Sequence, residues 1–310
     1  MADGNMAHRL TLKLVLVAFI LTAAGLLGVH SAAALAPGAA DEPAVTVRLS
    51  APAVRQGDVL VVRVSVQGNQ VAGGFGDAPL RFAPEGPELD GGRDFIALLG
   101  IDALREPGPY PMLITATVEN GVTEVVTRSV DVRPGRYIRE TVVLTSALKS
   151  LLDPALNAQE EEEVRAFYSG FTLPQWWDGP FRLPVKGKLL SVYGNRRIYN
   201  GVNLGTYHSG YDYSAIRGTP VKAAAPGRVA AVREFAIRGL TVVLDHGRGV
   251  FTSYYHLSKA GVSEGQLVDV GDEIGQVGST GRSQGNHLHF ELAVGGSPVD
   301  PGRWMGAALP

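Results

Sequence analysis

The sequence predicts a mainly β protein with an immunoglobulin-like β-sandwich at residues 44–133, a short helical linker at 134–180 and a two-layer antiparallel β domain at 181–304. Its 310 residues suffice for about two domains. The 39 glycines and 19 prolines, with only 7% aromatic residues, favour short strands and many turns over long helices. Apolar residues make up 45% and charged residues 19%, which excludes a wholly disordered chain.

The chain contains no cysteine, which excludes disulfides, cysteine-ligated metals and thiol catalysis. Its charge is unevenly distributed. Residues 181–310 carry 14 Lys and Arg against 9 Asp and Glu, whereas residues 1–180 carry 14 against 21. The mildly basic C-terminal part suits an anionic polymer as partner, although scattered solvated charge explains it equally well. We expect no nucleic-acid partner.

The first 36 residues have the pattern of an export signal. Arg9 and Lys13 precede an uncharged, largely apolar run at residues 14–29, and small residues dominate 31–36. We therefore expect the protein to be exported to the periplasm or cell envelope. Pro37 would hinder cleavage after residue 36, so the segment could equally remain as a single membrane anchor. A buried core helix is the alternative, and the terminal position with basic flanks argues against it.

Two patterns predict the sandwich. Apolar residues at 60, 62, 64 and 66 alternate with a set that includes Arg63 and Ser65, which is the period of two expected for a strand. Residues 112–118 and 124–132 form two further β-rich runs, and the Asn120-Gly121 pair between them is typical of a hairpin turn. The region contains no histidine and no convergent polar motif, so we expect no chemistry there.

Residues 146–152 and 157–168 predict two short helices in the linker. The second contains four consecutive glutamates, 160–163, near its expected start, where the helix dipole favours negative charge. Because consecutive carboxylates on a helix point in four directions, we interpret the run as a solvated face rather than a metal site. Trp176 and Trp177 follow, and we expect them to pack between the domains, with ligand binding as the alternative.

Histidine supplies the main indication of function. Two of the seven histidines precede residue 31, and the other five lie within 82 residues of the C-terminal domain, at His208, His246, His256, His287 and His289. Histidine is the commonest metal ligand and the natural acid or base near neutral pH. The clustering therefore indicates a catalytic or metal site. We interpret His246 as a turn residue whose ring bonds to the backbone, outside that site.

Three local patterns connect the other four histidines to chemistry. His208-Ser-Gly-Tyr-Asp212 brings an imidazole and a carboxylate toward one ion as the chain enters a strand. In His287-Leu-His289, a strand directs both imidazoles to the same face. His256 lies in an apolar run with no structural need for an imidazole. Singly, each pattern also fits an ordinary surface or core histidine, and only their combination is specific.

The combination predicts a catalytic zinc site. Such a zinc takes three protein ligands from His and carboxylate and keeps one position for a water that becomes acidic enough to attack a carbonyl. His208, Asp212 and one of His287 and His289 would supply the three ligands. The other member of that pair, together with His256, would remain for proton transfer and transition-state stabilisation.

Six motifs follow one another through the C-terminal domain: Phe181-Arg-Leu-Pro, Ser191-Val-Tyr-Gly-Asn-Arg-Arg197, His208-Ser-Gly-Tyr-Asp212, Gly218-Thr-Pro-Val-Lys-Ala-Ala, Tyr254-Tyr-His256-Leu and Gly278-Ser-Thr-Gly-Arg-Ser-Gln-Gly-Asn-His287-Leu-His289-Phe. In order and spacing they resemble the lysostaphin-type (LytM-like) zinc endopeptidases. The resemblance implies that His208, Asp212 and His289 bind Zn²⁺ and that His256 and His287 are catalytic. It also implies hydrolysis of amide bonds in peptidoglycan stem peptides or cross-links.

The resemblance leaves other functions to weigh. Some relatives have lost zinc ligands and act only as wall-binding or enzyme-activating modules, but all five positions are intact here. Alternatively, the sandwich could be the functional part of a surface adhesion protein. Members of the family often have a blocking segment before the catalytic domain, a part that residues 134–180 or the loop 198–207 could play. We expect the loop 278–285 to line the substrate site.

Overall fold

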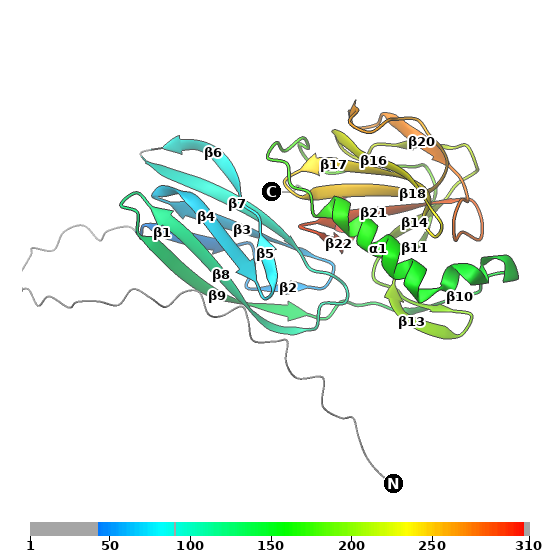
Figure 1. Cartoon of the computed structure of the whole chain (residues 1–310), viewed down its shortest axis with the longest axis horizontal. Helices are drawn as coiled ribbons and strands as arrows, with labels where there is room; N and C mark the ends of the chain where they lie inside the picture. The colour runs from blue at the N-terminus through cyan, green and yellow to red at the C-terminus, as the bar shows by residue number, and fades with distance from the viewer. Residues whose placement is uncertain (1–42, 90, 307–310) are drawn as a thin grey trace, which may run out of the picture. The chain divides into compact units, whose positions relative to one another are not determined.

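The computed structural model describes residues 43–89 and 91–306. The predicted export segment, residues 1–36, lies outside these ranges. Among the described residues, no helix is both long and apolar enough to span a membrane. The described residues form one compact unit built mainly of strands, as the sequence predicts (Figure 1).

Residues 45–133 form two sheets around a shared hydrophobic core. The first sheet has the strand order β1 (Val45–Leu49), β3 (Val59–Val66), β7 (Gly92–Gly100), β6 (Ala83–Leu89). The second has the order β2 (Ala53–Arg55), β9 (Thr123–Arg133), β8 (Gly108–Val118), β4 (Gly68–Phe75), β5 (Ala78–Leu80). Leu60, Val62 and Val64 of β3 are fully buried with Met112 and Ile114 of β8. The predicted alternation and the predicted β8–β9 hairpin are therefore confirmed, and the immunoglobulin-like topology stays a prediction.

Between the two β regions lie β10 (Arg139–Val142), the 3₁₀ helix η1 (Ser146–Leu152) and the α-helix α1 (Pro154–Tyr168). Both predicted helices are present. Helix α1 begins earlier than expected because Asp153 caps it, accepting a hydrogen bond from the Ala155 N–H, and because Pro154 suits a first helical turn. Strand β10 was not predicted, and it pairs in parallel with β12 (Arg196–Tyr199).

Residues 188–299 form a ten-stranded sheet. Its main path runs through β11 (Lys188–Ser191), β14 (Gly210–Ser214), β21 (His287–Val294), β18 (Val250–Ala260), β17 (Gly239–Gly247), β16 (Gly227–Phe235) and β19 (Leu267–Val268). Off this path, β15 (Pro220–Lys222) pairs with β20 (Glu273–Val277), β22 (Ser297–Val299) pairs with β21, and the 3₁₀ helix η2 (Pro301–Arg303) follows. Strand β18 leaves β21 after Tyr255 and joins β20 at Leu257, so the sheet branches there.

A hydrophobic core covers one face of this sheet and continues into the sandwich. Val242 and Phe290 from the sheet belong to the same buried cluster as Val61 of β3. Trp177 is also part of it, packed against Trp304 with only 3% of its surface exposed. The prediction that Trp177 serves packing is therefore confirmed.

Helix α1 covers the other face of the same sheet (Figure 1). Val164 and Tyr168 of the helix pack on Phe251 of β18 and Ala293 of β21. Because side chains alternate along a strand, Ala293 lies on the same face of β21 as Glu291 and His289. The helix thus lies on the face of β21 that also carries His289.

The glutamate run on α1 does not form a uniformly solvated face, and that prediction is wrong for Glu160. This side chain is only 3% exposed. Its carboxylate accepts hydrogen bonds from the backbone N–H groups of Ile237, at 2.7 Å, and Arg238, at 3.2 Å, and lies 3.3 Å from the Arg238 guanidinium. Glu161 and Glu163 instead accept hydrogen bonds from Arg165 and Gln159 of the same helix. Docking of α1 on the turn after β16 decides which glutamate is buried.

The expected loop at residues 198–207 is a β-hairpin, so that expectation is wrong. Strand β12 pairs with β13 (Val202–Tyr207), and β10 completes a three-stranded sheet. The turn consists of Asn200 and Gly201, which have φ values of 49° and 82°. Asn-Gly is the pair that best tolerates positive φ at both central positions of a tight hairpin turn. The Asn200-Gly201 pair could therefore have predicted this hairpin turn from the sequence.

Candidate metal centre

Two neighbouring strands bring the predicted ligands together. Strands β14 and β21 pair so that Asp212 lies opposite His289. His208 lies just before β14, and its backbone N–H donates to the Asn195 carbonyl at 2.8 Å. Leu288 is fully buried in the core, so the histidines on either side of it project from the opposite face, which confirms the predicted shared face.

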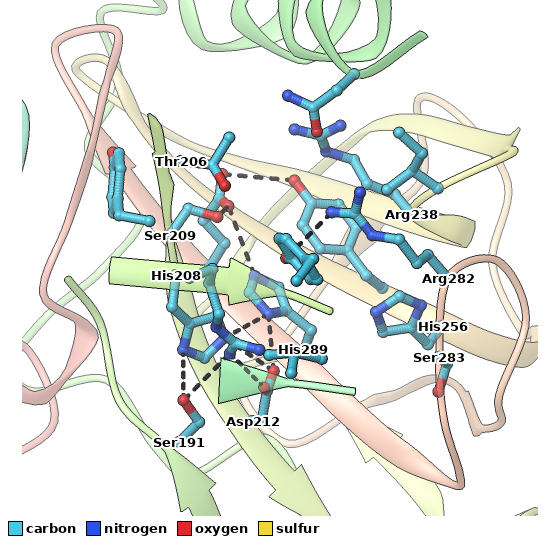
Figure 2. A pocket seen from close by; sticks show the side chains of 18 of the residues that line it. Ser191, Thr206, His208, Ser209, Asp212, Arg238, His256, Arg282, Ser283 and His289 are labelled. Carbon is cyan, nitrogen blue, oxygen red and sulfur yellow. Dashed lines mark hydrogen bonds and ion pairs between the residues drawn. The ribbon is translucent and has the colours of Figure 1, made fainter. Parts of the chain in front are cut away.

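The three predicted ligand residues converge on one point (Figure 2). His208 Nε2 lies 2.9 Å from Asp212 Oδ1 and 2.9 Å from His289 Nδ1. His289 Nδ1 lies 2.8 Å from the same carboxylate oxygen. All three residues are largely buried. One nitrogen from each ring and one oxygen therefore form a nearly equilateral triangle.

The partners of the outer ring nitrogens indicate where the protons lie. His208 Nδ1 is 2.9 Å from the Val192 carbonyl, which only accepts, so this nitrogen donates. His289 Nε2 faces the Glu291 carboxylate, another acceptor, at 3.6 Å. In its neutral form, each imidazole with this outer proton would turn a lone pair inward, toward Asp212. Three lone-pair atoms this close repel one another unless a cation lies among them, so the donor set fits a metal ion.

His256 and His287 form a second pair beside the first, with ring centroids 4.7 Å apart. His256 donates from Nδ1 to the Thr280 carbonyl at 2.8 Å, and His287 from Nδ1 to the Gly285 carbonyl at 2.9 Å. His287 Nε2 lies 3.8 Å from Asp212 Oδ1. Burial, together with the neighbouring imidazoles, lowers the pKa of His256 to about 3, so its ring is neutral near neutral pH.

The backbone explains how His256 reaches this position. It has a φ of 60°, in the left-handed region that non-glycine residues rarely adopt. It lies where β18 branches from β21 to β20, and its N–H bonds to the Arg238 carbonyl rather than to a strand partner. Such strained irregularities in strands re-aim a side chain and are common at functional sites.

Arg197 was not assigned a role from the sequence, and it contacts the carboxylate of the triangle. Its guanidinium donates to Asp212 Oδ2 at 3.0 Å and to the Ser191 hydroxyl at 3.1 Å. A guanidinium at this distance favours the ionised form of the Asp212 carboxylate. Arg197 ends the motif that begins at Ser191, and the fold of the β12–β13 hairpin places its guanidinium beside Asp212.

Glu291 is the second residue that sequence reasoning missed. It is 2% exposed and follows His289 by two positions on the same strand face. Its carboxylate accepts hydrogen bonds from the hydroxyls of Tyr168, at 2.6 Å, and Ser209, and from Tyr255 at 3.4 Å. Side chains on a strand repeat every two positions, so the reasoning that put His287 and His289 on one face would also have predicted Glu291 on that face.

The cluster opens into a cavity of about 810 Å³. Its walls come from β10, α1, the β12–β13 hairpin and residues 282–287 of the expected substrate loop. His246 is not part of it. This residue lies in β17 rather than in a turn, fully buried, with Nδ1 bonded to the Pro226 carbonyl at 2.7 Å and Nε2 to the Thr252 hydroxyl at 2.8 Å. Its exclusion from the site agrees with the sequence interpretation.

The C-terminal region is similar to known wall peptidases. Residues 206–301 match the sequence profile of Peptidase family M23. The peptidoglycan DD-endopeptidase ShyA of Vibrio cholerae is 40% identical over 121 residues, which are 38% of this chain and 28% of ShyA. The DD-carboxypeptidase/endopeptidase Mpg of Neisseria meningitidis serogroup B is 46% identical over 103 residues, which are 33% of this chain and 23% of Mpg. The match thus spans about a quarter of each relative.

The likeness in three dimensions extends beyond this region. A putative peptidase M23 from Pseudomonas aeruginosa superposes with a TM-score of 0.58 and 29% sequence identity, covering 84% of this chain and 96% of that one. The arrangement of strands upstream of residue 206 is therefore shared with another protein. The matches to M23 proteins agree with the lysostaphin-type resemblance of the motifs.

Proposed function

We propose that this chain, which carries a Peptidase family M23 domain at residues 206–301, is an exported zinc endopeptidase that hydrolyses amide bonds in peptidoglycan stem peptides or cross-links. One observation carries the proposal. His208, Asp212 and His289 turn three lone-pair atoms toward one point, with separations of 2.8–2.9 Å. A divalent cation bound by all three atoms would relieve the repulsion between their lone pairs.

The donor set favours zinc. Two imidazole nitrogens and one carboxylate oxygen are typical ligands of a catalytic zinc, which keeps a further position for water or substrate. Zinc held by these residues would polarise the scissile carbonyl and lower the pKa of a bound water. Arg197 holds Asp212 by its second oxygen, so Oδ1 remains directed at the other two donors.

His256 and His287 are the proposed catalytic residues. Each donates its Nδ1 proton to a backbone carbonyl, so each keeps an Nε2 lone pair. A neutral imidazole in this form accepts a proton. One of the two would take the proton of the attacking water, and the other would help to stabilise the developing oxyanion.

Peptidoglycan is the proposed substrate on two grounds. ShyA is named a peptidoglycan DD-endopeptidase, and Mpg is named a DD-carboxypeptidase/endopeptidase. Three arginines, Arg197, Arg238 and Arg282, also line the cavity. Arg197 and Arg238 each form an ion pair with a carboxylate, whereas no carboxylate of the described residues lies within 4 Å of the Arg282 guanidinium, which is therefore available to an anionic substrate. Peptidoglycan stem peptides carry carboxylates, which suit such a surface. The proposed location is the cell envelope, with residues 14–29 acting either as part of an export signal or as a membrane tether.

Digestion of purified peptidoglycan tests the proposal. The full chain, loaded with one equivalent of zinc, should release fragments whose masses correspond to cleaved stem peptides or cross-links. A chelator should abolish release and added zinc should restore it. A chain that binds zinc but releases no fragment would instead be a wall-binding or enzyme-activating module. A chain that binds no zinc would refute the metal centre itself.

A further inference from the structure

We propose that helix α1 is part of the metal centre, with Tyr168 and Glu291 as positioning residues for His289. The inference rests on the proposed zinc site. It assigns a role to a helix that lies outside residues 206–301 and to two side chains that belong neither to the proposed zinc ligands nor to the proposed catalytic pair.

The first step is the contact between Glu291 and His289. Glu291 Oε2 lies 3.6 Å from His289 Nε2, the nitrogen on the far side of the ring from Asp212. A carboxylate at this position favours a proton on Nε2 and therefore a lone pair on Nδ1. It also makes the imidazole a stronger ligand. Glu291 thereby selects the form of His289 that binds a metal.

The second step is how Glu291 is held. A buried carboxylate is costly unless several donors satisfy it. Tyr168 donates to Oε1 at 2.6 Å, Ser209 donates to Oε2, and Tyr255 lies 3.4 Å from Oε1. Figure 2 shows Ser209 on the side of His289 away from Asp212. Of these three donors, Tyr168 makes the shortest bond to Oε1, and it alone comes from the helix.

The third step is that the helix itself is firmly docked. Tyr168 is 2% exposed, and Val164 packs beside it on the sheet. One to two turns earlier, Glu160 accepts hydrogen bonds from the N–H groups of Ile237 and Arg238. The Arg238 carbonyl in turn accepts the His256 N–H at 3.0 Å. The helix is therefore linked to the metal ligands at one end and to the backbone of a catalytic histidine near its middle.

A purely structural role for these contacts is the competing explanation, and it makes a different prediction. Tyr254 provides a matched control, because its buried hydroxyl accepts a hydrogen bond from the Ala224 N–H at 2.9 Å on the core side of the same strand. Tyr254→Phe removes a buried hydroxyl without touching Glu291. If α1 only stabilises the fold, Tyr168→Phe and Tyr254→Phe should behave alike.

Zinc affinity of the full chain, measured by competition with a chromophoric chelator, is the test. Glu291→Gln should weaken zinc binding by about 10- to 100-fold, the range found for outer contacts of metal ligands. Tyr168→Phe should weaken it in the same direction, by about threefold or more. Tyr254→Phe should leave it unchanged while lowering the melting temperature. Cobalt-substituted Tyr168→Phe should also show an altered visible spectrum.

Each outcome decides between the explanations. Equal zinc affinity in wild type, Tyr168→Phe and Tyr254→Phe would overturn the inference while leaving the proposed function intact. If Glu291→Gln does not fold, Tyr168→Phe, which loses one oxygen atom, decides alone. A wild-type chain that binds no zinc would overturn the proposed function, and the inference with it.

Discussion

Two histidines on one strand face should respond to the same substitution in different ways. His287 and His289 are separated by one residue and project toward the same cavity. His289 Nδ1 is one corner of the donor triangle, 2.8 Å from Asp212 Oδ1. His287 Nε2 lies 3.8 Å from that oxygen and its ring is held by the Gly285 carbonyl. Replacing each by alanine therefore separates metal binding from catalysis.

The magnitudes follow from these positions. His289→Ala leaves two protein ligands, and a zinc site weakens steeply when one of three ligands is lost. We expect less than about a tenth of a zinc per chain and no measurable turnover. His287→Ala keeps all three ligands, so zinc should stay near one per chain. Loss of a general base or oxyanion donor typically reduces turnover by about 10²–10⁴-fold, or roughly 3–5 kcal/mol of barrier.

Metal content and release of wall fragments, measured on the same preparations, provide the assay. His256→Ala should resemble His287→Ala, because its Nε2 is also free of the metal triangle. The role assignment would be inverted if His287→Ala lost zinc while His289→Ala kept it. Three variants that retain both zinc and full turnover would refute the catalytic proposal.

Three further predictions concern stability. Burial lowers the pKa of His246 to about 4, below its ordinary 6.5. As pH falls from about 6.5 to 4, the unfolded chain therefore binds a proton that the folded chain does not, and the free energy of unfolding should drop by up to roughly 3 kcal/mol. His246→Gln should flatten this drop when stability is measured by denaturant titration at each pH. Glu160→Gln should cost about 2–4 kcal/mol, because it removes the carboxylate that pairs with the mostly buried Arg238 guanidinium. The exposed Glu163→Gln on the same helix should change stability by less than about 0.5 kcal/mol, and equal effects would refute the docking role. Removal of zinc by a chelator should lower Tm by roughly 5–10 °C relative to a sample with zinc at about 100 times Kd, and an unchanged Tm would count against a metal site in the folded state.

The sequence by itself predicted three strands of the sandwich (β3, β8 and β9), the helices η1 and α1, and the histidines of the site. These depend on relations between nearby residues. Alternation in residues 60–66 predicts one buried face, and His287-Leu-His289 predicts a shared face, because side chains on a strand repeat every two positions. The same reasoning could have found Glu291 two positions further on and the hairpin turn at Asn200-Gly201.

Only the tertiary structure decided which groups meet across the chain. Asp212 faces His289 because β14 and β21 pair in one particular register, across 77 positions of sequence. Glu160 is buried while Glu163 is exposed because α1 docks on the sheet at one angle, and the helical repeat alone does not choose between them. Tyr168 reaches Glu291 through the same docking. Local periodicity is a property of consecutive residues, whereas strand register and helix docking depend on packing between distant segments, which no single stretch of sequence encodes.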